Sequence, residues 1–169
     1  MNFKELLQDF PSKQSASIIA KSIIDQPQHI PSLWKFAKSD HKYAWRGAWI
    51  MDKMYDRAPE LIRPYIPEMI KTVESLTSEG QQRQFLKLIS LEPLPMNVSG
   101  KFINACFDWM NSALSPVAIR VYAMQILYNF TLHEPDLKQE VALCIETHME
   151  FGTAGFKSRG KKILKALAR

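Results

Sequence analysis

Apolar residues recur every three to four positions along most of the chain, as in amphipathic α-helices, and no segment alternates in the way a strand does. Ser12, Ser99 and the pair Ser115–Pro116 precede such segments and are predicted to start helices, because serine is a favoured N-cap and proline a favoured first residue. Further helices are expected over residues 41–57, 137–151 and 155–168. Pro64 and Pro67 predict a kink or a broken first turn in the helix that follows Pro59.

Four cations stand 37 residues apart, each early in the second helix of a predicted pair: Arg46, Arg83, Arg120 and Lys157. The positions three residues later are Trp49, Leu86, Ala123 and Gly160, and those six residues later are Asp52, Ile89, Ile126 and Ile163. The first helices repeat as well, with Ile66, Met69 and Ile70 matching Ile103, Cys106 and Phe107, and then Val141, Cys144 and Ile145. Two helices in each period of about 37 residues predict an α-solenoid, whose units bury their apolar faces by stacking.

The whole chain is therefore expected to form one domain, residues 1–169. Residues 1–26 are predicted to be a helical cap, and four repeats are predicted at 27–59, 60–97, 98–134 and 135–169. The last repeat ends in a basic helix.

The clearest unit, SPVAIRVYAMQIL at residues 115–127, resembles the second helix of a HEAT-type repeat. The matching residues are Pro116, Ile119, Arg120, Ala123, Ile126 and Leu127. The segment 40–54 has an aspartate, Asp40, at its start and keeps the arginine of that pattern as Arg46. It has Trp49 where a small residue is usual. The resemblance, over residues 27–169, implies an all-α fold of the HEAT-like (armadillo/HEAT) type, a right-handed α-α superhelix. It also implies that second helices line a concave, partner-binding surface.

Two tryptophans and two aspartates share one face of the second helix of the first repeat: Trp45, Trp49, Asp52 and Asp56. Aromatic rings offer contact area and carboxylates can orient a cationic ligand, so this set is a candidate recognition patch. In the alternative, the helix is rotated and both aspartates are solvated beside Lys53 and Arg57. The core stripe is then Ala44, Ala48, Met51, Tyr55 and Ala58.

The formal charge of +5 comes from the end of the chain. The last 19 residues carry six cations and no acid, whereas residues 1–150 have a net charge of −1. The candidate contacts for phosphate or an acidic partner are Lys157, Arg159, Lys161, Lys162 and Lys165. The alternative is that these cations complement the helix dipole and keep the last helix soluble. The four cations of the repeat are interpreted as structural, bridging neighbouring units through carbonyls or acids.

No nucleophile-elbow, P-loop, dinucleotide or HExxH motif is present, so neither a cofactor nor catalysis is expected. Cys144 and His148 share a helix face but lack further ligands, and no metal site is predicted. Cys106 and Cys144 are predicted to be core residues in a reducing cytoplasm. A secretory leader is not expected, because the first ten residues include Glu5 and Asp9 and contain no apolar h-region. A membrane span is not expected either, because no apolar run approaches about 20 residues.

The expected function is a non-enzymatic scaffold that binds a macromolecule, in the first place a protein, on its concave face. The alternative is a DNA-binding or alkylbase-excising protein, because the DNA-alkylation-repeat glycosylases share this general architecture. The catalytic aspartate of those enzymes cannot be aligned onto Asp52 or Asp108, and residues 1–150 have a net charge of −1, whereas those enzymes have a basic concave face. Nucleic acid is therefore the less favoured partner, and homodimerisation through an apolar edge is a third possibility.

Overall fold

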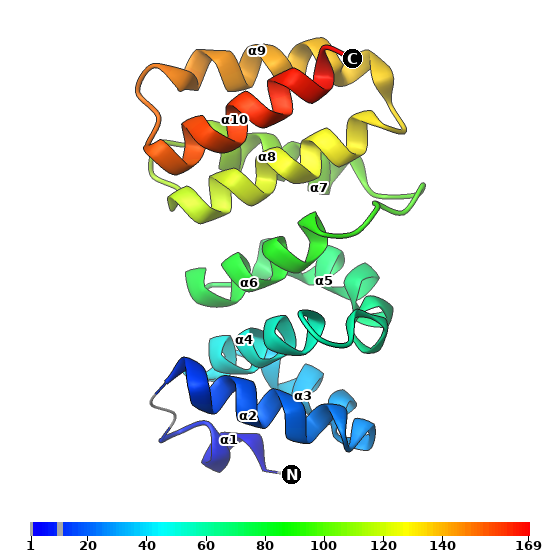
Figure 1. Cartoon of the computed structure of the whole chain (residues 1–169), viewed down its shortest axis with the longest axis vertical. Helices are drawn as coiled ribbons and strands as arrows, with labels where there is room; N and C mark the ends of the chain where they lie inside the picture. The colour runs from blue at the N-terminus through cyan, green and yellow to red at the C-terminus, as the bar shows by residue number, and fades with distance from the viewer. Residues whose placement is uncertain (1, 10–11) are drawn as a thin grey trace. The chain divides into compact units, whose positions relative to one another are not determined.

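The structure, a computed structural model, describes residues 2–9 and 12–169. In this part of the chain the backbone forms ten α-helices, joined by short 3₁₀ helices and turns, and no β-strand (Figure 1). The α-helices are α1 (Phe3–Leu6), α2 (Lys13–Ile24), α3 (Ile30–Ala37), α4 (Ala44–Tyr55), α5 (Ile66–Thr72), α6 (Glu79–Ser90), α7 (Gly100–Asn111), α8 (Val117–Thr131), α9 (Lys138–Met149) and α10 (Ala154–Leu167). The 3₁₀ helices are Pro27–His29, Pro59–Leu61, Arg63–Tyr65, Val73–Ser75 and Pro135–Leu137. The predicted all-α fold is confirmed.

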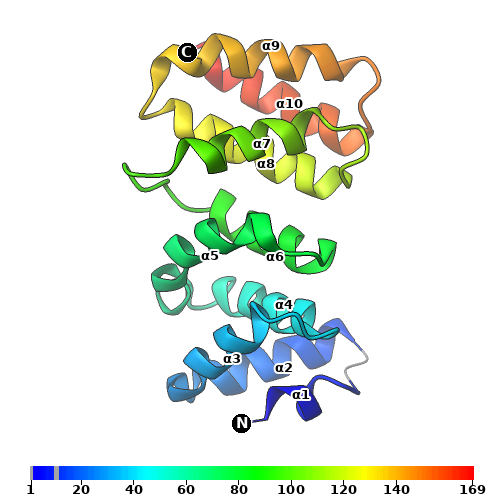
Figure 2. The same cartoon turned by 180° about the vertical axis from the view of Figure 1, so that it is seen from behind.

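The chain divides into two compact units, Met1–Leu88 and Ile89–Arg169. In the first unit α4 packs against both α2 and α3, and α1 packs against α3. In the second unit α8 packs against α7 and α10, and α10 also packs against α9. Within this second unit α8 and α10 face the viewer in Figure 1, and α7 and α9 do so in Figure 2. The second helices of its pairs thus form one layer and the first helices another.

The helix starts predicted at Ser12 and Ser99 are confirmed, and several others are displaced. The hydroxyl of Ser12 accepts a hydrogen bond from the Ser15 amide, and Ser99 caps α7 in the same way at 3.2 Å. The prediction for Ser115–Pro116 is wrong by one residue, because Pro116 is extended (ψ 142°) and is itself the N-cap of α8.

The second helix of the first pair begins at Ala44 rather than at residue 41. Residues 41–43 form a turn instead, in which Nδ1 of His41 accepts a hydrogen bond from the Tyr43 amide at 3.3 Å. The His41 ring also packs against Phe36, with the two ring centroids 5.3 Å apart. These side-chain contacts favour the turn over a further helical turn.

The prolines of the second pair act as predicted. Pro64 lies in the 3₁₀ turn Arg63–Tyr65, and Pro67 lies in the first turn of α5, where a missing amide hydrogen costs no helical hydrogen bond. The predicted broken first turn is therefore a 3₁₀ turn that precedes a short α5.

The repeat register correctly predicts which positions of the second helices are buried. Six residues after each cation, Ile89, Ile126 and Ile163 are at most 3% exposed. Asp52, at the same register position in α4, is also only 3% exposed. The repeat therefore directs a carboxylate into a position that is otherwise aliphatic.

Candidate functional site

Trp45 and Trp49 lie one turn apart on α4, and their rings stack with centroids 6.3 Å apart and an interplanar angle of 21°. Both side chains are half-buried. The beginning of α6 packs against Trp45 at Gly80, where an added Cβ would lie 3.0 Å from the Trp45 Cβ. The stacked indoles are thus held by their own helix and by α6 while part of their surface faces solvent.

Arg46 borders the aromatic pair and joins it to α1. Its guanidinium carbon lies 5.3 Å from the Trp45 ring centroid and 4.4 Å from that of Tyr43. Nη1 donates hydrogen bonds to the carbonyls of Leu7 at 2.5 Å and Gln8 at 2.9 Å, at the end of α1. These contacts with backbone carbonyls of an earlier helix support the structural role proposed for this cation.

Asp52 lies beneath the surface in a cluster of charges rather than in solvent. Its Oδ1 is 2.5 Å from Nζ of Lys87 in α6, and its Oδ2 is 3.5 Å from Nζ of Lys53. A buried carboxylate keeps its charge at acceptable cost only when cations lie this close. The alternative in which both aspartates are solvated is therefore wrong for Asp52, whose carboxylate joins α4 to α6. Its core stripe is confirmed at Ala44, Ala48, Met51 and Ala58, which are buried, whereas Tyr55 is half-buried.

Asp56 is the exposed member of the charge cluster, with its side chain 47% accessible. It accepts a hydrogen bond from Lys53 at 2.7 Å. Burial lowers the pKa of Lys53, but the hydrogen bond to Asp56 and the attraction of Asp52 outweigh it, so the pKa is raised. The sequence-predicted patch is thus a surface of stacked indoles beside the Lys53–Asp56 pair. Asp52 lies beneath this surface, where it pairs with Lys53 and Lys87.

Sequence reasoning did not identify a second polar cluster, at Glu68. Nε1 of Trp34 donates to Oε2 of Glu68 at 2.7 Å, and Lys38 donates to Oε1. The hydrogen bond from Lys38 lowers the pKa of Glu68 most, and the hydrogen bond from Trp34 lowers it further. Lys38 and Trp34 lie about 30 residues from Glu68 in sequence, so no local spacing signals the contact. The cluster ties α3 to α5.

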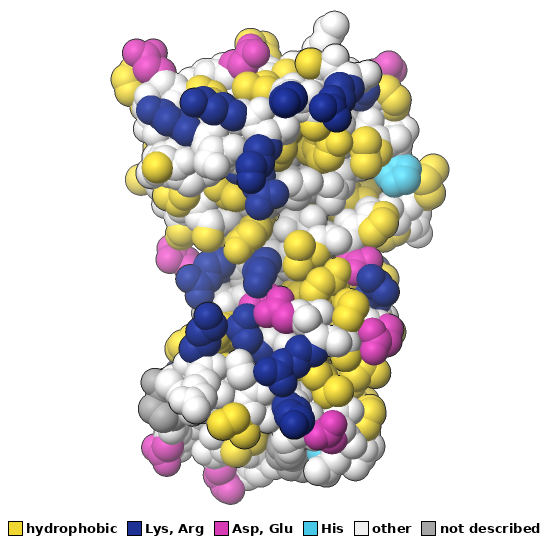
Figure 3. All heavy atoms as spheres, viewed as in Figure 1, with side chains coloured by type: hydrophobic (Ala, Val, Ile, Leu, Met, Phe, Trp, Pro, Cys, Tyr) yellow, Lys and Arg dark blue, Asp and Glu magenta, His cyan; other side chains and the backbone are white. Residues whose placement is uncertain are grey.

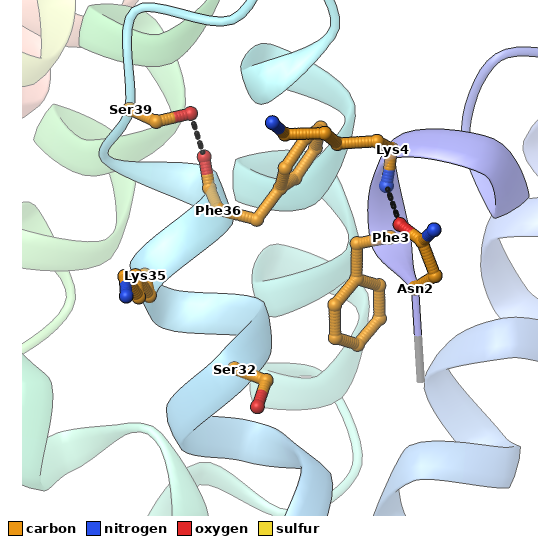
Figure 4. A pocket seen from close by; sticks show the side chains of 7 residues that line it. All are labelled: Asn2, Phe3, Lys4, Ser32, Lys35, Phe36 and Ser39. Carbon is orange, nitrogen blue, oxygen red and sulfur yellow. Dashed lines mark hydrogen bonds between the residues drawn. The ribbon is translucent and has the colours of Figure 1, made fainter.

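A cavity of about 340 Å³ lies between α1 and α3 (Figure 4). It is lined by Asn2, Phe3, Lys4, Ser32, Lys35, Phe36 and Ser39. The Ser39 hydroxyl donates to the Phe36 carbonyl, and the Asn2 side chain accepts from the Lys4 amide. These polar groups serve the helix ends rather than converging on the cavity, so the cavity does not define a site.

The other repeat cations have diverse surroundings. Nε of Arg120 donates to the Met110 carbonyl at 2.9 Å, and its guanidinium lies 4.5 Å from the Phe156 ring centroid. Burial lowers its pKa. Its carbonyl partner belongs to the first helix of its own pair, not to a neighbouring unit. Arg83 is exposed and Lys157 is half-buried.

The remaining C-terminal cations lie along α10. Lys161, Lys162 and Lys165 are exposed, whereas Arg159 is half-buried and donates to Oε1 of Gln125 at 2.8 Å. Arg159 is thus fixed to α8, and the lysines remain at the surface.

Among the described residues, no group of three or more histidines, cysteines and acids is placed to hold a metal ion. Cys106 is buried and Cys144 is half-buried, and neither forms a disulfide bond. None of the described helices combines the length and the apolar character needed to cross a membrane.

Paired helices that repeat at a regular spacing along the chain define a helical-repeat protein. A family model described as a HEAT repeat domain matches residues 3–167, and the chain belongs to that family. The searches of curated proteins and of solved structures gave no match.

Proposed function

We propose that this HEAT repeat protein is a non-enzymatic scaffold that binds a protein partner through the second helices of its first unit. Trp45, Trp49 and Asp56 are the proposed contact residues. Asp52 is proposed to act through Lys53 and Lys87, by fixing α4 against α6. In HEAT-type arrays the second helices usually line the concave surface, which is the face proposed for the partner.

The stacked, half-buried indoles are the observation that carries this proposal. Tryptophan, tyrosine and arginine are enriched among the residues that dominate protein–protein binding energy, and Tyr43 and Arg46 border the indole pair. The rings are already ordered by stacking, so little side-chain entropy is lost on binding. The Lys53–Asp56 pair at the edge supplies the polar rim that such interfaces have.

The alkylbase-excising alternative draws no support from this arrangement. Asp52 is engaged by two lysines and buried, and Asp108 is exposed on a first helix. The proposed cytoplasmic location and the possible homodimer rest on the sequence alone. Light scattering of the purified chain tests the dimer, which a monomer at high concentration would dismiss.

A site-specific photocrosslinker tests the proposed interface. We expect a crosslinker at position 56, on the exposed rim of the patch, to capture a protein that a crosslinker at position 71, exposed on α5, does not capture. The captured protein is then purified and titrated against Trp49→Ala. A loss of affinity of about 30-fold is expected for a residue that dominates binding, which corresponds to ~2 kcal/mol. Equal capture at both positions, or an unchanged Kd, rules the interface out.

A further inference from the structure

Helix α10 presents a row of lysines to solvent. It carries five cations and no acid. Lys157, Lys161 and Lys165 follow one another at intervals of four residues, which on an α-helix places them on one side at steps of about 6 Å. Figure 3 shows Lys and Arg side chains gathered over this helix, on the face of the second unit that Figure 1 presents.

The opposite side of α10 is fixed in the core of the second unit. Phe156, Ile163 and Leu167 are buried, and Gly160 lies so close to α9 that an added Cβ would be 2.8 Å from Sδ of Met149. No large apolar side chain of α10 is among the exposed residues of the described chain. The helix is therefore held in one orientation, with its apolar side in the core, Lys161, Lys162 and Lys165 exposed, and Lys157 half-buried.

The net positive charge of this unit lies in one of its two helix layers. The second helices α8 and α10 contain six cations and no acid, whereas the first helices α7 and α9 contain three acids and two cations. Within the described residues, no carboxylate forms an ion pair with the four lysines of α10. Their charge is not neutralised inside the protein.

Helix stability does not account for this arrangement. The helix dipole favours cations at a C-terminus, which suits Lys165, but Lys157 lies in the first turn, where the dipole opposes a positive charge. The pairs Lys157–Lys161 and Lys161–Lys165 also place like charges four residues apart, which destabilises a helix. A bound polyanion removes both unfavourable effects.

We propose that the lysine row of α10 binds the phosphate backbone of a nucleic-acid duplex without sequence preference. Lysine is a point-charge ligand for phosphate, and a duplex offers one negative charge per ~1.7 Å of its axis. A protein partner fits less well, because lysine is depleted from protein–protein interfaces and this helix exposes no aromatic ring. A membrane fits less well too, because interfacial helices insert an exposed apolar side, and that of α10 is buried.

This surface lies within the second unit and is independent of the indole patch in the first, so the two proposals fail separately. The test is fluorescence anisotropy of the full chain with a labelled DNA duplex and an RNA duplex of the same sequence. The test variant is Lys157→Gln/Lys161→Gln/Lys165→Gln. The matched control, Lys4→Gln/Lys35→Gln/Lys71→Gln, removes three exposed lysines from α1, α3 and α5 of the first unit and so changes the net charge equally.

Contacts from the four lysines predict that raising the salt from 50 to 200 mM weakens duplex binding by about 150-fold. One remaining lysine in the test variant predicts a loss of only about three- to fourfold over the same range. The control is expected to keep the steep dependence. Binding of both duplexes supports recognition of the backbone, and binding of only one narrows the proposal to that form. The proposal is overturned by no binding at 50 mM salt, by equal changes in both variants, or by binding of phosphatidylserine vesicles or polyglutamate in place of both duplexes.

Discussion

Removing Lys87, the nearer of the two cations that contact Asp52, should destabilise the first unit strongly. At an effective dielectric constant of about 20, the 2.5 Å contact between Lys87 and Asp52 is worth ~7 kcal/mol of attraction, and the 3.5 Å contact from Lys53 ~5 kcal/mol. Desolvation of the ions offsets much of this, and deleting one partner of a buried pair typically costs about 3–5 kcal/mol. Because Lys53 remains, we expect Lys87→Met to lower the free energy of unfolding by ~3 kcal/mol.

Urea unfolding followed by tryptophan fluorescence measures this loss, because Trp34, Trp45 and Trp49 lie in the first unit. With an m-value of ~2 kcal/mol/M, the midpoint should fall by ~1.5 M. The matched control is Arg83→Met, which removes an exposed cation one turn earlier in α6 and should change stability by less than ~0.5 kcal/mol. Similar losses in the two variants would refute the reasoning.

The double variant Asp52→Ile/Lys87→Met separates the cost of an unpaired charge from the worth of the pair. Isoleucine occupies the equivalent position in the later repeats, so the register accepts it. Replacing a buried pair by apolar residues is often neutral or stabilising by about 1–4 kcal/mol. The double variant should therefore be at least as stable as the wild type, and a loss as large as that of Lys87→Met alone would contradict this account.

Three further predictions concern pH and packing. Glu68 has a lowered pKa, so its stabilising contribution is present above its ordinary pKa and is lost as the pH falls below it; Glu68→Gln should flatten the acid side of a plot of Tm against pH. Burial, followed by the nearby Arg120 charge, lowers the pKa of His148, so stability should fall as the pH drops below about 6.5. In His148→Asn that decline should disappear from the same plot. In Gly155→Ala the added Cβ lies at an ordinary 3.7 Å contact distance, so urea unfolding should show α10 stabilised by ~0.5–1 kcal/mol. In Gly160→Ala the added Cβ clashes with Met149, and the same measurement should show no such gain.

The fold was predictable because the period is carried by several positions at once. The spacing of the four cations, with the apolar residues three and six positions later, sets the register of the second helices. That register places Asp52 where later repeats have isoleucine, but the residue pattern indicates a recognition patch or solvent for Asp52, and its burial was not predicted. Its partner was not predictable, since Lys87 belongs to the next second helix and only packing brings the two together. The same holds for Glu68 and Trp34.

Local errors arose where side chains compete with capping signals. The sequence predicts a helix from residue 41, but the ring and backbone of His41 accept hydrogen bonds that form a turn, and α4 begins at Ala44. The exposure of Trp45 and Trp49 was not predictable either, because it depends on how far α6 covers them. Gly80 in α6 is what allows the close approach to Trp45.

Hydrogen exchange of the chain, alone and with the protein captured at position 56, tests the central proposal most directly. The proposed interface predicts added protection in α4, around Trp45 and Trp49, with α3 and α5 unchanged. Protection confined to the first helices, or none in α4, would contradict a scaffold that binds through its indole patch.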